Sequence, residues 1–143
     1  MKKISPLAYF LVALNDFFHG VWIGPNVQAG KGLSLGHPRG LVLNPGTTIG
    51  DYCTLLNQVT CGGPSVSIGN YVEIGVGAKL ISNFNRRVQI GNHCIIGAGA
   101  VVTKSFPSGS VVAGVPAKII HSKNYSEWME RHRYYPIDKL DIE

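Results

Sequence analysis

One histidine in the sequence stands in a context that suits acid–base chemistry. His37 is followed by Pro38, Arg39 and Gly40, and it lies beside an interruption of a repeat that runs through most of the chain. An imidazole titrates near neutral pH, so it can take a proton from a hydroxyl group and give it up again. We therefore predict that His37 is a general base. The remaining histidines, for which we expect structural roles, are His19, His93, His121 and His132.

The cysteines and histidines do not predict a metal site. No two histidines have the spacing of a zinc-binding set, and Cys53, Cys61 and Cys94 form no CxxC pair. Three cysteines, an odd number, do not make a disulfide framework, and small buried thiols are typical of a reducing cytoplasm. We expect no metal and a cytoplasmic location.

A six-residue repeat predicts the structure that positions His37. An aliphatic residue followed by glycine recurs, with interruptions, at Ile23, Leu35, Ile49, Ile68, Ile74, Ile90 and Ile96. The fifth position of these hexads is small or β-branched, as at Val27, Cys53, Val59, Val72, Ala78, Cys94 and Ala100. Each hexad therefore supplies a short strand and a corner, and the aliphatic side chains stack from one coil to the next. A charged fraction of 15% and 18 glycines agree with such a turn-rich, all-β architecture.

The repeat is interrupted near Gly40 to Val42, at Cys61 to Ser67, and at Ile81 to Gln89. We expect loops that protrude from the wall of the solenoid at these places, and loops carry function more often than walls do.

Both ends of the chain predict short helices. The apolar stretch 4–18 follows two lysines, but Asn15 and Asp16 interrupt it and it is too short to span a bilayer. We expect a helix that caps the solenoid or packs on a neighbouring subunit, and we consider membrane contact unlikely. Residues 124–135 begin with a capping-box spacing. We expect a single domain, with an N-terminal helical cap (1–20), a β-helix (21–121), and a C-terminal helix and tail (122–143).

The net charge of +5 and the pI near 9.2 indicate an anionic partner. The basic residues are scattered along the chain and do not cluster with aromatic residues on a helix, so we expect no binding of nucleic acid. A phosphorylated cofactor accounts for the excess charge.

Three segments closely resemble the serine acetyltransferases and related saccharide O-acetyltransferases, which are hexapeptide-repeat acyltransferases: Leu35 to Pro45, Ile49 to Cys53, and Val59 to Gly63. The resemblance extends over roughly residues 23 to 120. It implies a left-handed parallel β-helix, an exception to the right-handed crossover rule. It also implies a homotrimer with the CoA site between subunits, and direct acetyl transfer from acetyl-CoA to a hydroxyl that His37 deprotonates.

The same resemblance implies further site residues. Gly62 and Gly63 resemble contacts at the thiol end of CoA, where their N–H groups could stabilise an oxyanion, although an ordinary turn before Pro64 explains them equally well. The expected lining of the CoA groove is Gly75, Gly77, Ala98 and Ala113. The expected phosphate contacts are Lys104 and Lys118, and the alternative for each is a solvated surface lysine.

The chain departs from the serine acetyltransferases at two positions. That family pairs its catalytic histidine with an aspartate where this chain has Trp22, and it carries a basic loop where this chain has the uncharged residues 64–67. An indole is suited to stacking on a sugar ring. We therefore expect O-acetylation of a sugar or polysaccharide precursor, with Trp22, Arg39 and Asn57 contacting the acceptor. Two alternatives stay open, a serine O-acetyltransferase and a catalytically silent β-helix that serves as a binding module.

Overall fold

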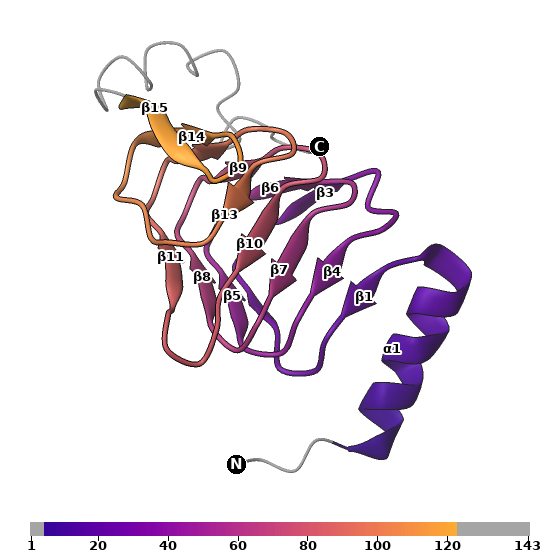
Figure 1. Cartoon of the computed structure of the whole chain (residues 1–143). Coiled ribbons are helices and arrows are strands. Elements are labelled where there is room, and N and C mark those ends of the chain that lie inside the picture. Colours follow the sequence, from indigo (N-terminus) through magenta and orange to yellow (C-terminus); the bar gives the residue numbers. More distant parts are fainter. Residues whose placement is uncertain (1–4, 123–143) are drawn as a thin grey trace.

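The computed structural model describes residues 5–122, in which short parallel strands wind into a three-walled solenoid (Figure 1). Sheet A consists of β1 (Trp22–Ile23), β4 (Val42–Leu43), β7 (Thr60–Gly62), β10 (Lys79–Ile81) and β13 (Val101–Val102). Sheet B consists of β2 (Gln28–Ala29), β5 (Thr47–Ile49), β8 (Val66–Ile68) and β11 (Val88–Ile90). Sheet C consists of β3 (Ser34–Gly36), β6 (Thr54–Leu56), β9 (Glu73–Ile74), β12 (Ile95–Ile96), β14 (Ser110–Ala113) and β15 (Lys118–Ser122). The predicted all-β, parallel β-helix is confirmed.

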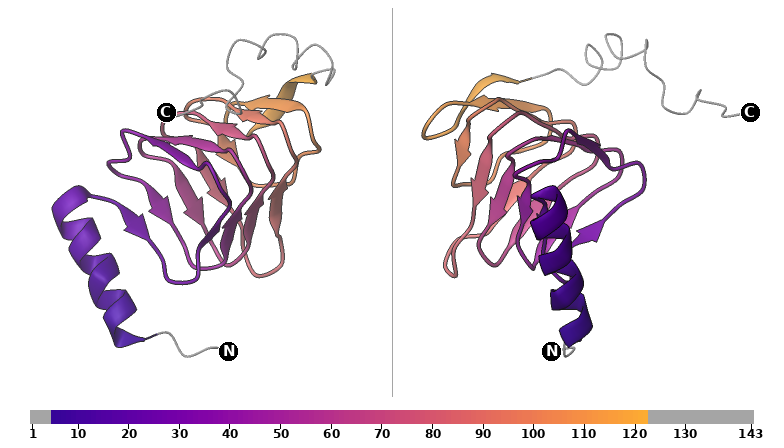
Figure 2. Two further views of the ribbon diagram at one scale, coloured as in Figure 1. Left: turned by 180° about the vertical axis from the view of Figure 1, so that it is seen from behind. Right: turned by 90° about the vertical axis from the view of Figure 1, so that its right-hand side faces the viewer.

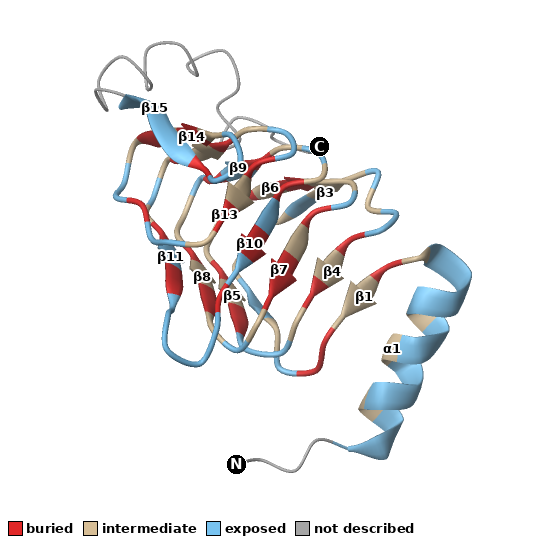
Figure 3. Ribbon diagram, viewed as in Figure 1, coloured by how far each residue is buried: buried red, intermediate tan, exposed pale blue. Residues whose placement is uncertain are grey.

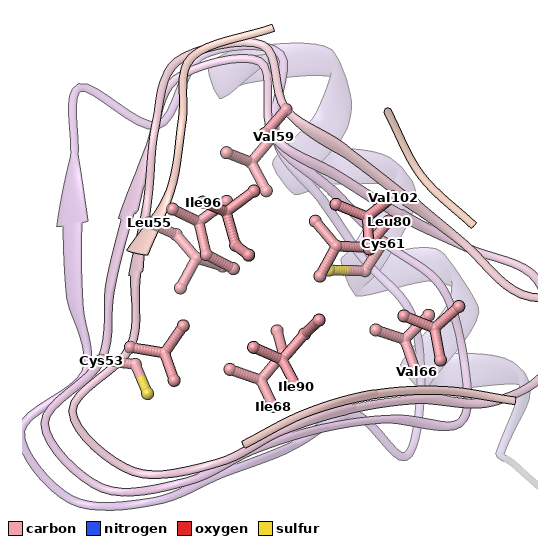
Figure 4. Packing of buried hydrophobic residues seen from close by; sticks show 14 of the residues in the cluster. Cys53, Leu55, Val59, Cys61, Val66, Ile68, Leu80, Ile90, Ile96 and Val102 are labelled. Carbon is pink, nitrogen blue, oxygen red and sulfur yellow. The ribbon is translucent and has the colours of Figure 1, made fainter. Parts of the chain in front are cut away.

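Three corners join the walls, and we name each by the sheets it connects. The CA corner consists of residues 37–41, 57–59, 75–78 and 97–100. The AB corner consists of residues 24–27, 44–46, 63–65, 82–87 and 103–105, and the BC corner of residues 30–33, 50–53, 69–72, 91–94 and 107–109. Figure 4 looks along the solenoid axis and shows Val59 at the CA corner and Cys53 at the BC corner.

The core is a set of aliphatic columns, one on the inner face of each wall (Figure 4). In sheet A the strand register stacks Leu43, Cys61, Leu80 and Val102, and all four side chains are buried. In sheet C the register stacks Leu55, Ile74, Ile96 and Val112. Burying one such side chain stabilises the fold by roughly 1.5–3 kcal/mol. The small fifth positions are buried at the corners, as the repeat predicts: Cys53, Val59, Val72, Ala78, Cys94 and Ala100.

The BC corner carries a column of stacked aromatic side chains. The ring centroids of Tyr52 and Tyr71 are 5.3 Å apart, and those of Tyr71 and His93 are 4.9 Å apart with only 6° between the ring planes. All three residues have left-handed backbone angles, with φ between 54° and 56°. A left-handed conformation costs a non-glycine residue about 1–2 kcal/mol, and stacking of this kind contributes roughly 0.5–1.5 kcal/mol per pair. His93 therefore has the structural role expected for it.

Of the three expected loops, only the one at Ile81 to Gln89 protrudes from the wall of the solenoid. Between β7 and β8 only Gly63–Ser65 intervene, so the loop expected at Cys61 to Ser67 is wrong: its residues pair as strands in sheets A and B. Residues 37–41 form a slightly long corner. Between β10 and β11, in contrast, Asn83 and Arg86 pair as a small antiparallel hairpin.

Helix α1 (Pro6–His19) lies beside β1 at one end of the solenoid, and β14–β15 lie at the other end (Figures 1 and 2). Ser5 caps its N-terminus by accepting a hydrogen bond from the Leu7 N–H at 3.3 Å, and Gly20 ends it with a φ of 64°. The Asn15 side chain donates to the Val21 carbonyl at 2.6 Å, which ties the helix to β1. The predicted N-terminal helix is confirmed.

No residue of α1 is buried, and Figure 3 shows the helix almost entirely exposed. Its large exposed apolar side chains with i, i+3, i+4 spacing form one stripe, which consists of Leu7, Phe10, Leu11, Leu14, Phe17 and Phe18. Within residues 5–122, no helix has the length and apolar character needed to cross a bilayer. The C-terminal helix expected at 124–135 lies outside the described residues.

Candidate active site

The CA corner brings together most of the expected site residues. His37 directly follows β3, and the pairing of Gly36 with Leu56 places it level with Asn57 in the next coil. One coil further, the Gly77 N–H donates to the Asn57 carbonyl at 3.0 Å. Arg39 joins the same corner, because its carbonyl accepts a hydrogen bond from the Gln58 N–H at 3.2 Å. Residues that are distant in sequence thus form one line along the edge of the solenoid.

The backbone of His37 is left-handed, with a φ of 51°, and its side chain is exposed. This conformation turns the chain from sheet C into sheet A and leaves the imidazole on the outer surface, where a substrate hydroxyl could reach it. Among residues 5–122 no carboxylate pairs with His37. Asp16 lies on α1, where its backbone carbonyl accepts a hydrogen bond from the Gly20 N–H. The described part of the chain therefore offers no carboxylate to orient this imidazole.

Trp22 begins sheet A, next to the CA corner. Its N–H donates to the Leu41 carbonyl at 2.9 Å, and it pairs with Val42 of β4. The neighbouring column Ile23, Leu43 points into the core, so Trp22 points outward, and its side chain is half-buried. The indole is thus one strand away from the His37 corner, on the outer face of sheet A.

Gly62 ends β7 and Gly63 begins the AB corner, at the opposite edge of sheet A from His37. The Ser82 hydroxyl donates to the Gly62 carbonyl at 3.2 Å and accepts from the Ser65 N–H at 3.0 Å. Gly63 has a φ of 87°, and a Cβ atom there would overlap the Ser82 carbonyl. The turn itself therefore requires glycine at 63. Within one chain, these glycines and His37 do not form a single pocket.

The small residues expected to line the CoA groove are stacked along the CA corner. A Cβ on Gly75 would lie 2.6 Å from the Ala98 nitrogen, and one on Gly97 would lie 3.1 Å from the Ala113 Cβ, so small side chains permit this close stacking. Gly77, in contrast, has open space around it, since a Cβ there would meet nothing within 4 Å. The corner is therefore flat along one stretch and open along another, as a surface that accommodates an extended ligand would be.

The two lysines expected to meet phosphates lie apart. Lys118 begins β15 and pairs with Ala113, at the CA end of sheet C. Lys104 lies at the AB corner, where its Nζ is 5.5 Å from the centre of the Phe106 ring. The basic residues look scattered in the sequence, but in the structure Arg86 lies beside Lys104. The Arg86 Nη1 donates to the carbonyl of the adjacent Thr103 at 3.4 Å. Arg86 and its neighbour Arg87 were not among the expected site residues.

The three cysteines are buried, and none of them forms a disulfide. Burial raises the pKa of Cys61 to about 12, and burial likewise raises the pKa of the Cys53 and Cys94 thiols. These groups stay protonated at neutral pH and are unsuited to nucleophilic chemistry. The cytoplasmic location inferred from them stays a prediction. Residues 5–122 contain no cluster of His, Cys, Asp or Glu that could hold a metal ion.

Known proteins that are similar to this chain include serine acetyltransferases. The chain is 33% identical over 127 residues to a serine acetyltransferase of Synechococcus elongatus, covering 84% of this chain and 50% of the relative. It is 36% identical over 126 residues to that of Staphylococcus xylosus, covering 83% of this chain and 56% of the relative. The structure of a Brucella melitensis protein described as a bacterial transferase hexapeptide repeat and serine O-acetyltransferase superimposes with a TM-score of 0.77 at 37% identity, covering 82% of this chain and 48% of that one. The chain belongs to the hexapeptide-repeat acyltransferase family.

The resemblance found in the residues is thus confirmed, although no family model matches the chain. The chain spans about half the length of the curated relatives it matches. Serine acetyltransferase of Brucella abortus in complex with coenzyme A superimposes with a TM-score of 0.77 at 35% identity, over 82% of this chain and 48% of that one. The Neisseria gonorrhoeae enzyme in complex with serine has a TM-score of 0.75 at 35% identity, over 80% of this chain and 48% of that one.

Proposed function

We propose that this chain transfers an acetyl group from acetyl-CoA directly to an acceptor hydroxyl, with His37 as the general base. The observation that carries the proposal is the exposed imidazole of His37 at the head of a corner of small residues. The imidazole takes the hydroxyl proton while the hydroxyl oxygen attacks the thioester carbonyl carbon. The C–S bond then breaks, and the imidazolium returns its proton to the leaving thiolate. The products are the O-acetyl ester and free CoA.

We further propose L-serine as the acceptor. The sugar acceptor expected from Trp22 finds no support among the relatives, which are described as serine acetyltransferases, and one solved neighbour contains serine. The serine alternative fits these findings better. Trp22, Arg39 and Asn57 stay the proposed acceptor contacts, because all three lie at or next to the CA corner.

The groove for acetyl-CoA follows the CA corner in this proposal, lined by Gly75, Gly77, Ala98 and Ala113, with Lys118 at its far end. The stacking of these small residues supports the assignment, since the stretch around Gly77 is open to the surface. Acetyl-CoA is a co-substrate here, and the proposed reaction requires no metal.

We propose that the working unit is a homotrimer in which each active site lies between two subunits. His37 and the pair Gly62–Gly63 occupy opposite edges of sheet A, so one chain does not bring the base and the proposed oxyanion donors together. A neighbouring subunit could supply the second edge. Sedimentation equilibrium at micromolar concentration tests this directly. A monomer that retains full activity would contradict it.

The decisive experiment measures CoA release from acetyl-CoA with L-serine, simple sugars and nucleotide sugars as acceptors. We expect serine-dependent release that the His37→Asn variant loses. Release with sugars alone would overturn serine as the acceptor and leave the chemistry intact. The binding-module alternative predicts no release with any acceptor and no stabilisation by acetyl-CoA. An authentic site would stabilise the fold by about 2.7 kcal/mol at a hundred times Kd.

A further inference from the structure

The hairpin at the AB corner is an ordered projection from an otherwise smooth wall. A single antiparallel bridge closes it, in which the Asn83 N–H donates to the Arg86 carbonyl at 3.0 Å and the Arg86 N–H donates to the Asn83 carbonyl at 3.1 Å. The Asn83 side chain also accepts a hydrogen bond from the Asn85 N–H at 3.0 Å. Between them, Phe84 is 96% exposed. A large aromatic ring is thus exposed to solvent on a hairpin that its own hydrogen bonds close.

Three cations lie on or beside the hairpin that carries this ring, and none of them has an acidic partner in the described part of the chain. Arg86 and Arg87 are exposed on the hairpin, and Arg86 reaches the Thr103 carbonyl in the next coil, beside Lys104. The acidic residues among residues 5–122 are Asp16, Asp51 and Glu73, which lie on α1, at the BC corner and on sheet C. None of the three cations forms an ion pair in the described part of the chain. Their charge is therefore available to an external anion.

We propose that the AB corner which a neighbouring subunit brings to the groove in the proposed trimer binds the nucleotide end of the cofactor through Phe84, Arg86, Arg87 and Lys104, with the ring stacked on adenine and the cations on the phosphates. An arginine guanidinium can donate two parallel hydrogen bonds to one phosphate, and an exposed aromatic side chain stacks on a base of any identity. This inference rests on the proposed function, because it assigns residues to the acetyl-CoA that the function requires.

The position of the cluster along the solenoid axis indicates which anion it binds. It favours the phosphates of the cofactor over the carboxylate of the acceptor. His37 enters sheet A at β4, whereas the hairpin leaves it at β10 and Lys104 follows β13. These are separations of two and three strand spacings, or about 10 and 14 Å along the axis. The carboxylate of an amino acid lies only a few ångströms from its hydroxyl and cannot span that distance. The arm of CoA between its sulfur and its first phosphorus is as long as about four extended residues, or roughly 15 Å. It can therefore span the distance from His37 to the cluster.

The test uses isothermal titration of the full chain with CoA. The Arg86→Gln/Arg87→Gln double variant removes both guanidinium groups, and Phe84→Ala removes the ring. Lys31→Gln is the matched control, because Lys31 is an exposed cation beside the Tyr52 ring, at the BC corner. We expect the Kd for CoA to rise about tenfold or more in the double variant and about fivefold in Phe84→Ala, with less than a twofold change in Lys31→Gln.

Adenosine 3′,5′-bisphosphate, which lacks the pantetheine arm, separates the two ends of the cofactor. We expect it to bind the wild type and to bind the double variant at least tenfold more weakly. If the wild type binds CoA and the double variant binds it equally well, the nucleotide site is elsewhere and this inference is overturned while the proposed function stands. If the wild type does not bind CoA at all, the proposed function is overturned, and this inference with it.

Discussion

Replacing His37 with asparagine separates the chemistry of this residue from its backbone conformation. With a φ of 51°, His37 occupies the left-handed region, where asparagine is among the better tolerated residues and alanine is poorly tolerated. The amide of asparagine cannot take up a proton at neutral pH. His37→Asn should therefore keep the corner intact and lose the base, whereas His37→Ala would disturb both.

The expected magnitudes differ between rate and stability. Loss of a general base typically lowers kcat by a factor of about 10² to 10⁴, which corresponds to roughly 3–5 kcal/mol of transition-state stabilisation. The exposed side chain of His37 contributes little packing, so the melting temperature of His37→Asn should stay near that of the wild type. His37→Ala should lose about 1 kcal/mol of stability in addition, or roughly 3 °C in Tm.

The assay follows CoA release spectrophotometrically with saturating acetyl-CoA and L-serine, and records Tm for each variant. His93→Asn is the control, since His93 is also a corner histidine with a left-handed φ of 56°. That variant should lose the stacking on Tyr71 and some stability, but keep its turnover. If His37→Asn retained more than about a tenth of the wild-type kcat, His37 would not be the base.

Three further predictions concern the solenoid. Gly50→Ala should lower the free energy of unfolding by about 1–3 kcal/mol, because its Cβ would lie 2.7 Å from the Gly69 backbone; an unchanged urea midpoint would contradict this packing. Leu80→Ala should cost about 2–5 kcal/mol in the same measurement, since Leu80 is fully buried in the sheet A column. A cost under about 1 kcal/mol would mean that the coils collapse onto the cavity. The raised pKa of Cys61, about 12 in the folded chain against 9.0 as the ordinary value, means that unfolding favours ionisation, so stability should fall as pH rises above about 9. Urea titrations at pH 8 and 10 should show a smaller decline for Cys61→Ala than for the wild type, and equal declines would refute the shift.

The architecture could be predicted from the sequence because the repeat is local. An aliphatic residue and glycine in each hexad specify one buried side chain and one tight corner, whatever the neighbouring coil contains. The buried columns through Leu55 and Leu80 follow directly from that pattern. The interruptions of the repeat do not by themselves show which structure fills them. Seven residues from Cys61 to Ser67 accommodate two strands and a short turn, whereas Ile81 to Gln89 contain a hairpin, and both read as breaks in the period.

Contacts between coils join residues about twenty positions apart, and the six-residue pattern does not reveal these contacts. The stacking of Tyr71 on His93 exists because the coils place successive corners one strand spacing apart. The approach of Arg86 to Thr103 has the same origin, and it converts basic residues that look dispersed into a cluster.

The sequence by itself thus determined the coil and its core, and it singled out the histidine that we propose as the base, because each is encoded within one hexad or one short motif. Only the tertiary structure decided which corner each candidate occupies. It placed His37, Asn57 and Gly77 on one edge, and it placed Gly62 on another. The physical reason is that the corner a residue reaches depends on the number of residues in every preceding wall and turn, and a single added residue changes that position without altering the local pattern.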